Sequence, residues 1–138
     1  MNNISENQVV KLSLRLWGER LKPEEITEAF GFEPSYSYEK GYRKPLPGGR
    51  LSAPRELGIW VFQQAIKHSL EDELYSFLNK IKDKDLKCIK GVQIIILDLY
   101  LGLSDNDSVL ENSYECRIDN NVLLEIAQLG VDFRITVS

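Results

Sequence analysis

Residues 92–103 read VQIIILDLYLGL, a run that is nearly all apolar and rich in isoleucine. Such a run is typical of a central strand covered on both faces, because β-branched side chains fit a pleated, buried surface. It is too short to span a bilayer, so no membrane association is expected. Asp98 interrupts it. Since a buried carboxylate needs a partner, we predict that Asp98 pairs with Arg15 or Arg134, or is exposed, rather than acting as a poised acid or base.

Four other segments are predicted to be strands of the same sheet. Residues 10–17 and 131–137 alternate apolar and polar side chains, which indicates strands with one wet face. Residues 59–66 carry apolar side chains of both parities, and residues 114–118 again alternate. Together with the run at 92–103, these segments predict a mainly antiparallel five-stranded sheet.

Helices are predicted between the strands from their start and stop signals. Pro23 favours a first helical turn, and Gly31 favours a left-handed stop. Ser69 is expected to cap a second helix, and Asp119 or Asn120 a third. About three helices on one face of the sheet make a two-layer α+β sandwich of ferredoxin-like character.

Composition limits the classes of protein. With 138 residues, of which 43% are hydrophobic and 28% charged, residues 1–138 are predicted to form a single α+β domain. The net charge of −4 disfavours nucleic acid as a partner. The start of the chain has no signal-peptide pattern, and the two cysteines have no metal or redox spacing. We therefore expect a cytoplasmic protein with reduced cysteines, no metal and no cofactor.

A long loop, about residues 33–57, holds the strongest functional signal. Between Tyr36 and Arg55, five basic side chains face Glu39 alone, so the local charge is +4 and the rest of the chain carries −8. Interleaved tyrosines and cations bind anionic ligands, single-stranded nucleic acid or acidic protein surfaces. The alternative is a solvated loop whose cations neutralise the domain's own acids. The candidate binding residues are Tyr36, Tyr38, Lys40, Tyr42, Arg43, Arg50, Arg55 and Trp60.

No catalytic constellation is recognised. His68, the only histidine, adjoins Ser69, and sequence neighbours at a strand-to-helix junction have no reason to meet in catalytic geometry. We therefore expect a non-catalytic module rather than an enzyme, one that binds another protein as an immunity-type or regulatory domain does. The alternative is a binder of a small anionic ligand or nucleotide that uses Arg43, Arg50 and Arg55 of the loop.

The sheet face away from the helices needs a cover. Whichever parity faces the helices, either Ile59 and Val61 or Trp60 and Phe62 are left on the far side, and apolar stripes of that size are normally hidden. One cover is the loop at 32–57, folded across with its tyrosines on the stripe. The other is a second copy packed sheet to sheet in a homodimer. We favour the loop, because tyrosine rings supply apolar area with polar tips.

Short turn and core motifs are spread along nearly the whole chain. They are Pro23-Glu24-Glu25-Ile26-Thr27 through Gly31-Phe32-Glu33-Pro34, then Lys40-Gly41, Gly58-Ile59-Trp60 and Leu129-Gly130-Val131-Asp132-Phe133. In this combination the chain resembles the bacterial family of domain of unknown function 4279. The resemblance implies a bacterial cytoplasmic protein. It transfers no catalytic residue onto this sequence.

Overall fold

One sheet with the strand order β2-β3-β1-β4-β5 runs through the computed structural model, which describes residues 8–103 and 117–138. The strands are β1 (Gln8–Gly18), β2 (Tyr36–Tyr38), β3 (Gly58–Ile66), β4 (Ile94–Leu103) and β5 (Asp132–Val137). Neighbouring strands are antiparallel except β4 and β5, which are parallel. The predicted α+β fold with a mainly antiparallel, five-stranded sheet is confirmed.

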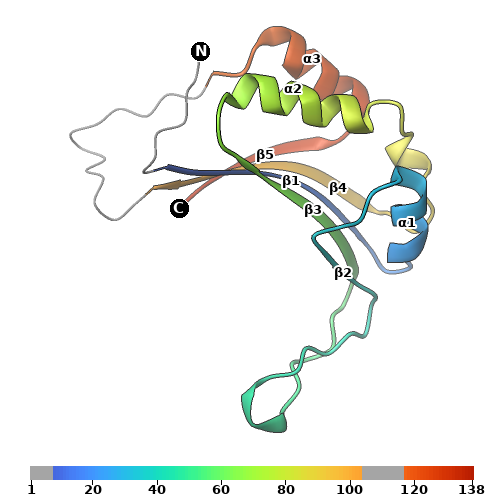
Figure 1. Cartoon of the computed structure of the whole chain (residues 1–138). Helices are drawn as coiled ribbons and strands as arrows, with labels where there is room; N and C mark the ends of the chain where they lie inside the picture. Colours follow the sequence, from blue (N-terminus) through green and yellow to red (C-terminus); the bar gives the residue numbers. More distant parts are fainter. Residues whose placement is uncertain (1–7, 104–116) are drawn as a thin grey trace.

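The α-helices of the described chain lie together on one face of the curved sheet, on its convex side (Figure 1). They are α1 (Pro23–Phe30), α2 (Leu70–Ile81) and α3 (Asn120–Leu129). Gly31 and Gly130 end α1 and α3 in the left-handed region, with φ of 81° and 71°, where other residues would be strained. Ser69 and Asp119 cap α2 and α3 by accepting a hydrogen bond from a backbone N–H. The predicted helix boundaries therefore hold.

The core lies between the helices and the three inner strands. Strand register brings apolar side chains of equal parity together: Leu16 of β1 lies between Trp60 of β3 and Ile95 of β4. The fully buried residues of β1 are Leu12, Leu14 and Leu16. Below α1, the ring of Trp60 lies 4.9 Å from that of Phe30. Pairing across the three strands thus decides which alternate residues of each strand face the helices.

The strand composition of the sheet differs from the sequence prediction. Residues 114–116 of one predicted strand lie outside the described residues, and Arg117 and Ile118 are not in a strand. The edge strand β2 instead comes from the segment predicted as loop, and it pairs with β3. Ser35 anchors its start, because its hydroxyl accepts a hydrogen bond from the backbone N–H of Gln63. β2 is a strand because it pairs with β3. Its three residues are too few to show the alternation by which a strand is recognised in sequence.

The helices cover one face of β4 and leave the other face uncovered. Leu97 and Leu99 are buried in the core, whereas Ile94, on the opposite face, is 43% exposed. The prediction that both faces of this strand are covered is therefore wrong at Ile94. None of the helices in residues 8–103 and 117–138 is long and apolar enough to cross a membrane.

Candidate functional site

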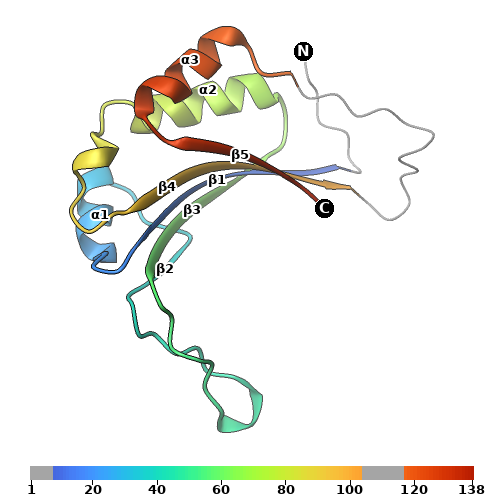
Figure 2. The ribbon, with the colours of Figure 1, turned by 180° about the vertical axis from the view of Figure 1, so that it is seen from behind.

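Residues 39–56 form a hairpin that projects from the sheet beyond β2 and β3, and we call it the basic arm (Figure 2). Backbone hydrogen bonds hold its two sides together: Gly41 N–H donates to Arg55 O, and Ser52 N–H donates to Lys44 O, both at 2.8 Å. Gly48 has a φ of 82° at the tip, which a side chain would strain. Residues 41–50 are all exposed. The arm is therefore a defined projection with a large solvent-facing surface.

Tyrosine rings and cations gather at the base of the arm. The rings of Tyr38 and Tyr42 are stacked with centroids 5.3 Å apart, and the Arg55 guanidinium lies 5.2 Å from the Tyr38 centroid. Such a cation over an aromatic face is favourable. A groove of about 850 Å³ runs along this cluster, lined by Tyr36, Ser37, Tyr38, Glu39, Lys40, Tyr42, Lys44 and Arg55. The structure thus brings five of the predicted binding residues together here.

Most cations of the arm form no ion pair with an acid among the described residues. Lys40 pairs with Glu19 at 3.0 Å, and this hydrogen bond and charge lower the pKa of the Glu19 carboxyl. Arg43 donates instead to the carbonyl oxygen of Ser52 at 3.0 Å. Within the described part of the chain, Lys44 and Arg50 have no ion-pair partner. An ion pair within the domain therefore neutralises Lys40. The charges of the other four basic residues of the arm can act on a partner.

Trp60 lies apart from this group. Its side chain is 0% exposed on the helix side of the sheet, and its indole N–H donates to Thr27 Oγ1 at 3.0 Å. The rings of Phe30 and Phe32 lie 4.9 Å and 5.9 Å from it. The structure therefore places Trp60 in the core and does not bring it to the surface that carries the other predicted binding residues.

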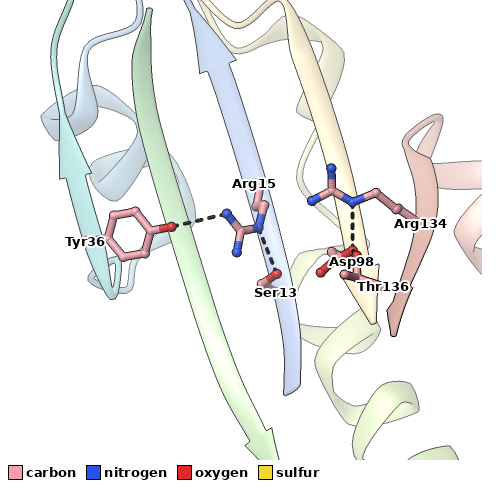
Figure 3. Close-up of polar contacts among 6 residues, drawn as sticks. All are labelled: Ser13, Arg15, Tyr36, Asp98, Arg134 and Thr136. Carbon is pink, nitrogen blue, oxygen red and sulfur yellow. Dashed lines mark hydrogen bonds and ion pairs between the residues drawn. The ribbon is translucent and has the colours of Figure 1, made fainter. Parts of the chain in front are cut away.

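The side of the sheet away from the helices, which we call the open face, covers part of its apolar stripe with its own long side chains. Val61 lies on this face and is 0% exposed. Tyr36 and Arg15 are paired with Val61 from the two neighbouring strands. An Arg15 guanidinium nitrogen donates to the Tyr36 hydroxyl at 3.2 Å (Figure 3). These two side chains meet across Val61 and shield it, and the stem of an arginine packs well on apolar surface.

The prediction that the loop at 32–57 folds across the open face is therefore wrong for the loop as a whole, although Tyr36 does cover Val61 as predicted. Its first part enters the sheet as β2, and its tip at Leu46 is 41% exposed on the projecting arm. The physical reason is that β2 satisfies its backbone by pairing with the edge of β3. A sheet-to-sheet homodimer is not needed to hide Val61, because shielding within one chain already does so.

Asp98 has the paired role predicted for it. Arg134 Nε donates to Asp98 Oδ1 at 2.8 Å, and Thr136 donates to the same oxygen at 2.8 Å (Figure 3). Asp98 is 3% exposed, so these bonds replace the water that its carboxylate loses. Both partners come from β5. The arrangement fastens the edge strand β5 to β4 and gives Asp98 a structural role.

Trp17 and Ile94 of the open face were not among the predicted site residues. Trp17 and Ile94 are paired across β1 and β4, and Ile59 of β3 pairs with Trp17 from the other side. Tyr38 of β2 pairs with Ile59 and completes the row. One signal was available in the sequence, since Trp17 shares the parity of Lys11, Ser13 and Arg15 on the wet side of its strand. A tryptophan at such a position is a candidate anchor.

Charge is separated between the two layers of the domain. α1 carries three acidic side chains and no basic one, α2 carries three acidic side chains and Lys80, and α3 carries Glu125. The opposite side presents the basic residues Lys11, Arg15 and Arg134 of the open face, together with those of the arm. Among the described residues, the acids on that side are Glu39, Glu56, Asp98 and Asp132, and Glu19 lies beside it in its ion pair with Lys40. In the described part of the chain, the α-helices therefore form an acidic helix layer, with Lys82, Lys84 and Lys90 in the segment after α2, and the sheet with the arm forms a basic side.

Shortening the tip of the arm is expected to leave the fold unchanged. In the variant, residues 46–50 are replaced by Asn-Gly, a pair suited to a tight hairpin turn. All the removed residues are exposed, so the free energy of unfolding should change by less than about 0.5 kcal/mol. Urea denaturation measures this. Binding of a hydrophobic dye to the shortened variant would show instead that the tip covers apolar surface.

The described residues hold neither a metal-binding cluster nor an activated thiol. Within the described segments, no cluster of three His, Cys, Asp or Glu side chains is placed to hold a metal ion. Cys88 is exposed and unpaired, and a hydrogen bond to Asp85 raises the pKa of its thiol. Cys116 lies outside the described residues. A raised thiol pKa keeps Cys88 in its less nucleophilic, protonated form.

Comparison with known proteins identifies one family. The family model described as Domain of unknown function (DUF4279) matches residues 7–138. No curated protein and no solved structure matches the chain. The matched range covers both the arm and the open face.

Proposed function

The chain belongs to the DUF4279 family, and from its surface we propose that it is a bacterial cytoplasmic binding module without catalytic activity that recognises an acidic partner protein. Immunity-type and regulatory domains are modules of this kind. The observation that carries the proposal is the separation of charge between the acidic helix layer and the basic side. An acidic partner is attracted to the basic side and repelled from the helices, which also fixes its orientation.

The composition of the basic side supports protein recognition. Binding energy at protein interfaces is concentrated in tyrosine, tryptophan and arginine side chains. Tyr36 and Tyr42 are 40% and 43% exposed, and the Arg55 guanidinium lies against Tyr38. These side chains are already held by stacking and backbone pairing, so little conformational entropy is lost when a partner binds.

The test uses a charge reversal in the arm. Lys44→Glu with Arg50→Glu changes two exposed residues that have no ion-pair partner among those described. The parent protein, immobilised, should retain one or more proteins from a bacterial lysate at low salt. The double variant should bind the purified partner about tenfold or more weakly, measured by calorimetry. Raising the ionic strength should weaken the parent complex as well.

A matched control separates local from overall charge. Lys67→Glu with Lys82→Glu makes the same change in net charge at exposed positions outside the arm. It should leave the affinity for the partner within about twofold of the parent. Equal losses in both double variants, or a retained partner that is basic, would contradict the proposal.

The groove at the base of the arm favours a second candidate, a small anionic ligand or nucleotide. Its lining combines three tyrosines with Lys40, Lys44 and Arg55, and aromatic faces with cations bind nucleotides. A thermal-shift screen with nucleotides and phosphorylated metabolites distinguishes the two functions. Stabilisation that is lost in the Lys44 and Arg50 double variant would favour the small ligand, because a ligand that binds only the folded state stabilises it by RT ln(1 + [ligand]/Kd).

A further inference from the structure

A second, smaller groove lies where the foot of the arm meets the open face. Its volume is about 400 Å³, and its apolar lining comes from Trp17, Tyr38, Ala53, Pro54, Leu57 and Ile59. Two different parts of the fold make it. One wall is the returning side of the arm, and the floor is a row of side chains that crosses β2, β3 and β1.

The floor of this groove is apolar and partly open to solvent. Tyr38, Ile59 and Trp17 are paired in register across the sheet, and Ile94 continues the row on β4. Ile59 is 5% exposed, Trp17 is half-buried, and Ile94 is 43% exposed. A concave surface that combines an aromatic ring with aliphatic side chains accepts a bulky apolar anchor from a partner.

The rim of the groove is basic. Arg55 lines it and lies against Tyr38, and Arg15 occupies the next residue of that parity in β1 beside Trp17. Lys40 and Lys44 line the larger groove on the other side of the tyrosines. The acid in the lining of the smaller groove is Glu56. A carboxylate beside the anchor would therefore meet mostly positive charge.

We propose that this groove holds a bulky apolar side chain from an acidic segment of the partner protein. The inference rests on the proposed function and adds the chemistry of the contact. The anchor occupies the pocket between Trp17 and the arm. Carboxylates next to the anchor in the partner's sequence lie against Arg55 and Arg15, which selects acidic over neutral or basic segments.

The experiment selects ligands from a displayed library of random peptides, with the whole chain as the target. Enriched peptides should carry leucine, phenylalanine or tryptophan flanked by aspartate or glutamate. Synthetic copies without tryptophan, with leucine or phenylalanine as the anchor, are then titrated into the Trp60→Phe variant. Because the chain has two tryptophans and Trp60 is in the core, the remaining fluorescence reports on Trp17. Binding of an anchor should shift its emission maximum, because the indole becomes less exposed to water.

Two substitutions test the location, Arg55→Glu on the rim of the groove and Ile94→Glu beside the groove, at the residue paired with Trp17. Ile94→Glu and Arg55→Glu should each weaken binding of the selected peptides by about tenfold or more. Ile94 is 43% exposed, so its replacement should leave the fold intact, and circular dichroism checks this. Lys67→Glu, at an exposed position at the end of β3, should leave the affinity unchanged.

Several outcomes would overturn the inference. They are a library that yields no enriched peptide, a consensus without acidic residues, and binding that Ile94→Glu does not weaken. Its failure can be told apart from failure of the proposed function. One such outcome is that Lys44→Glu with Arg50→Glu abolishes binding of the partner while Arg55→Glu and Ile94→Glu leave it unchanged. In that case the partner contacts the basic arm and does not use the groove.

Discussion

Replacing Trp60 with alanine is expected to lower the free energy of unfolding by about 3–5 kcal/mol, the usual loss for a large aromatic residue in a packed core. The side chain is 0% exposed, and its ring lies against Phe30 and Phe32. Its removal leaves a cavity beneath α1 and takes away the donor that bonds Thr27 Oγ1. The measurement is the midpoint and slope of urea denaturation, followed by circular dichroism.

Trp60→Phe is the matched control for this prediction. It keeps a ring in the aromatic cluster but leaves Thr27 without its indole donor, so a smaller loss of about 1–2 kcal/mol is expected. It should also bind the partner and the selected peptides as the parent does, because Trp60 has no exposed surface. A Trp60→Phe protein that folds but no longer binds would show that Trp60 does belong to the binding site.

Substituting Gly18 with alanine is expected to cost about 1–3 kcal/mol or more. A Cβ at this position would collide with the carbonyl oxygen of Gly91, which is backbone and cannot rotate away. The end of β1 and the turn before β4 approach closely here because Gln93 N–H donates to Trp17 O at 2.8 Å, and Gln93 Oε1 accepts from Glu19 N–H. Relief would require β1 to separate from the turn before β4. Urea denaturation again measures the loss.

Gly102→Ala is the control for the Gly18 prediction. Its new Cβ would first meet the side chain of Tyr100 rather than backbone, and a side chain can adjust. The expected change in stability is within about 0.5 kcal/mol. A Gly18→Ala protein as stable as Gly102→Ala would show that the junction of β1 and β4 is looser than the structure indicates.

Local signals in the sequence determined the helices and the strands with a clear period. Pro23 and Gly31 bound α1, Ser69 caps α2, and Asp119 caps α3, because each acts within one helical turn of its own position. The alternation in β1 likewise marks which of its side chains face the core. The need of a buried Asp98 for a basic partner was also readable, since desolvation of a carboxylate does not depend on the fold.

Strand pairing decided the features that the sequence left open. Arg15 and Arg134 were both possible partners for Asp98, and the parallel register of β4 with β5 places Arg134 opposite it. β2 is three residues long and is a strand because it pairs with β3. Pairing energies of this kind join residues far apart in the chain, so no local window contains them.

The candidate site depends on the same long-range pairing. The sequence determined that the segment from Tyr36 to Arg55 is basic and rich in tyrosine. Only the tertiary structure turned it into a projecting arm, placed Trp17 beside its foot with Ile94 next to Trp17, and moved Trp60 into the core. The physical reason is that a strand's side chains alternate between faces, and the face each parity takes is settled by the core formed with neighbouring strands.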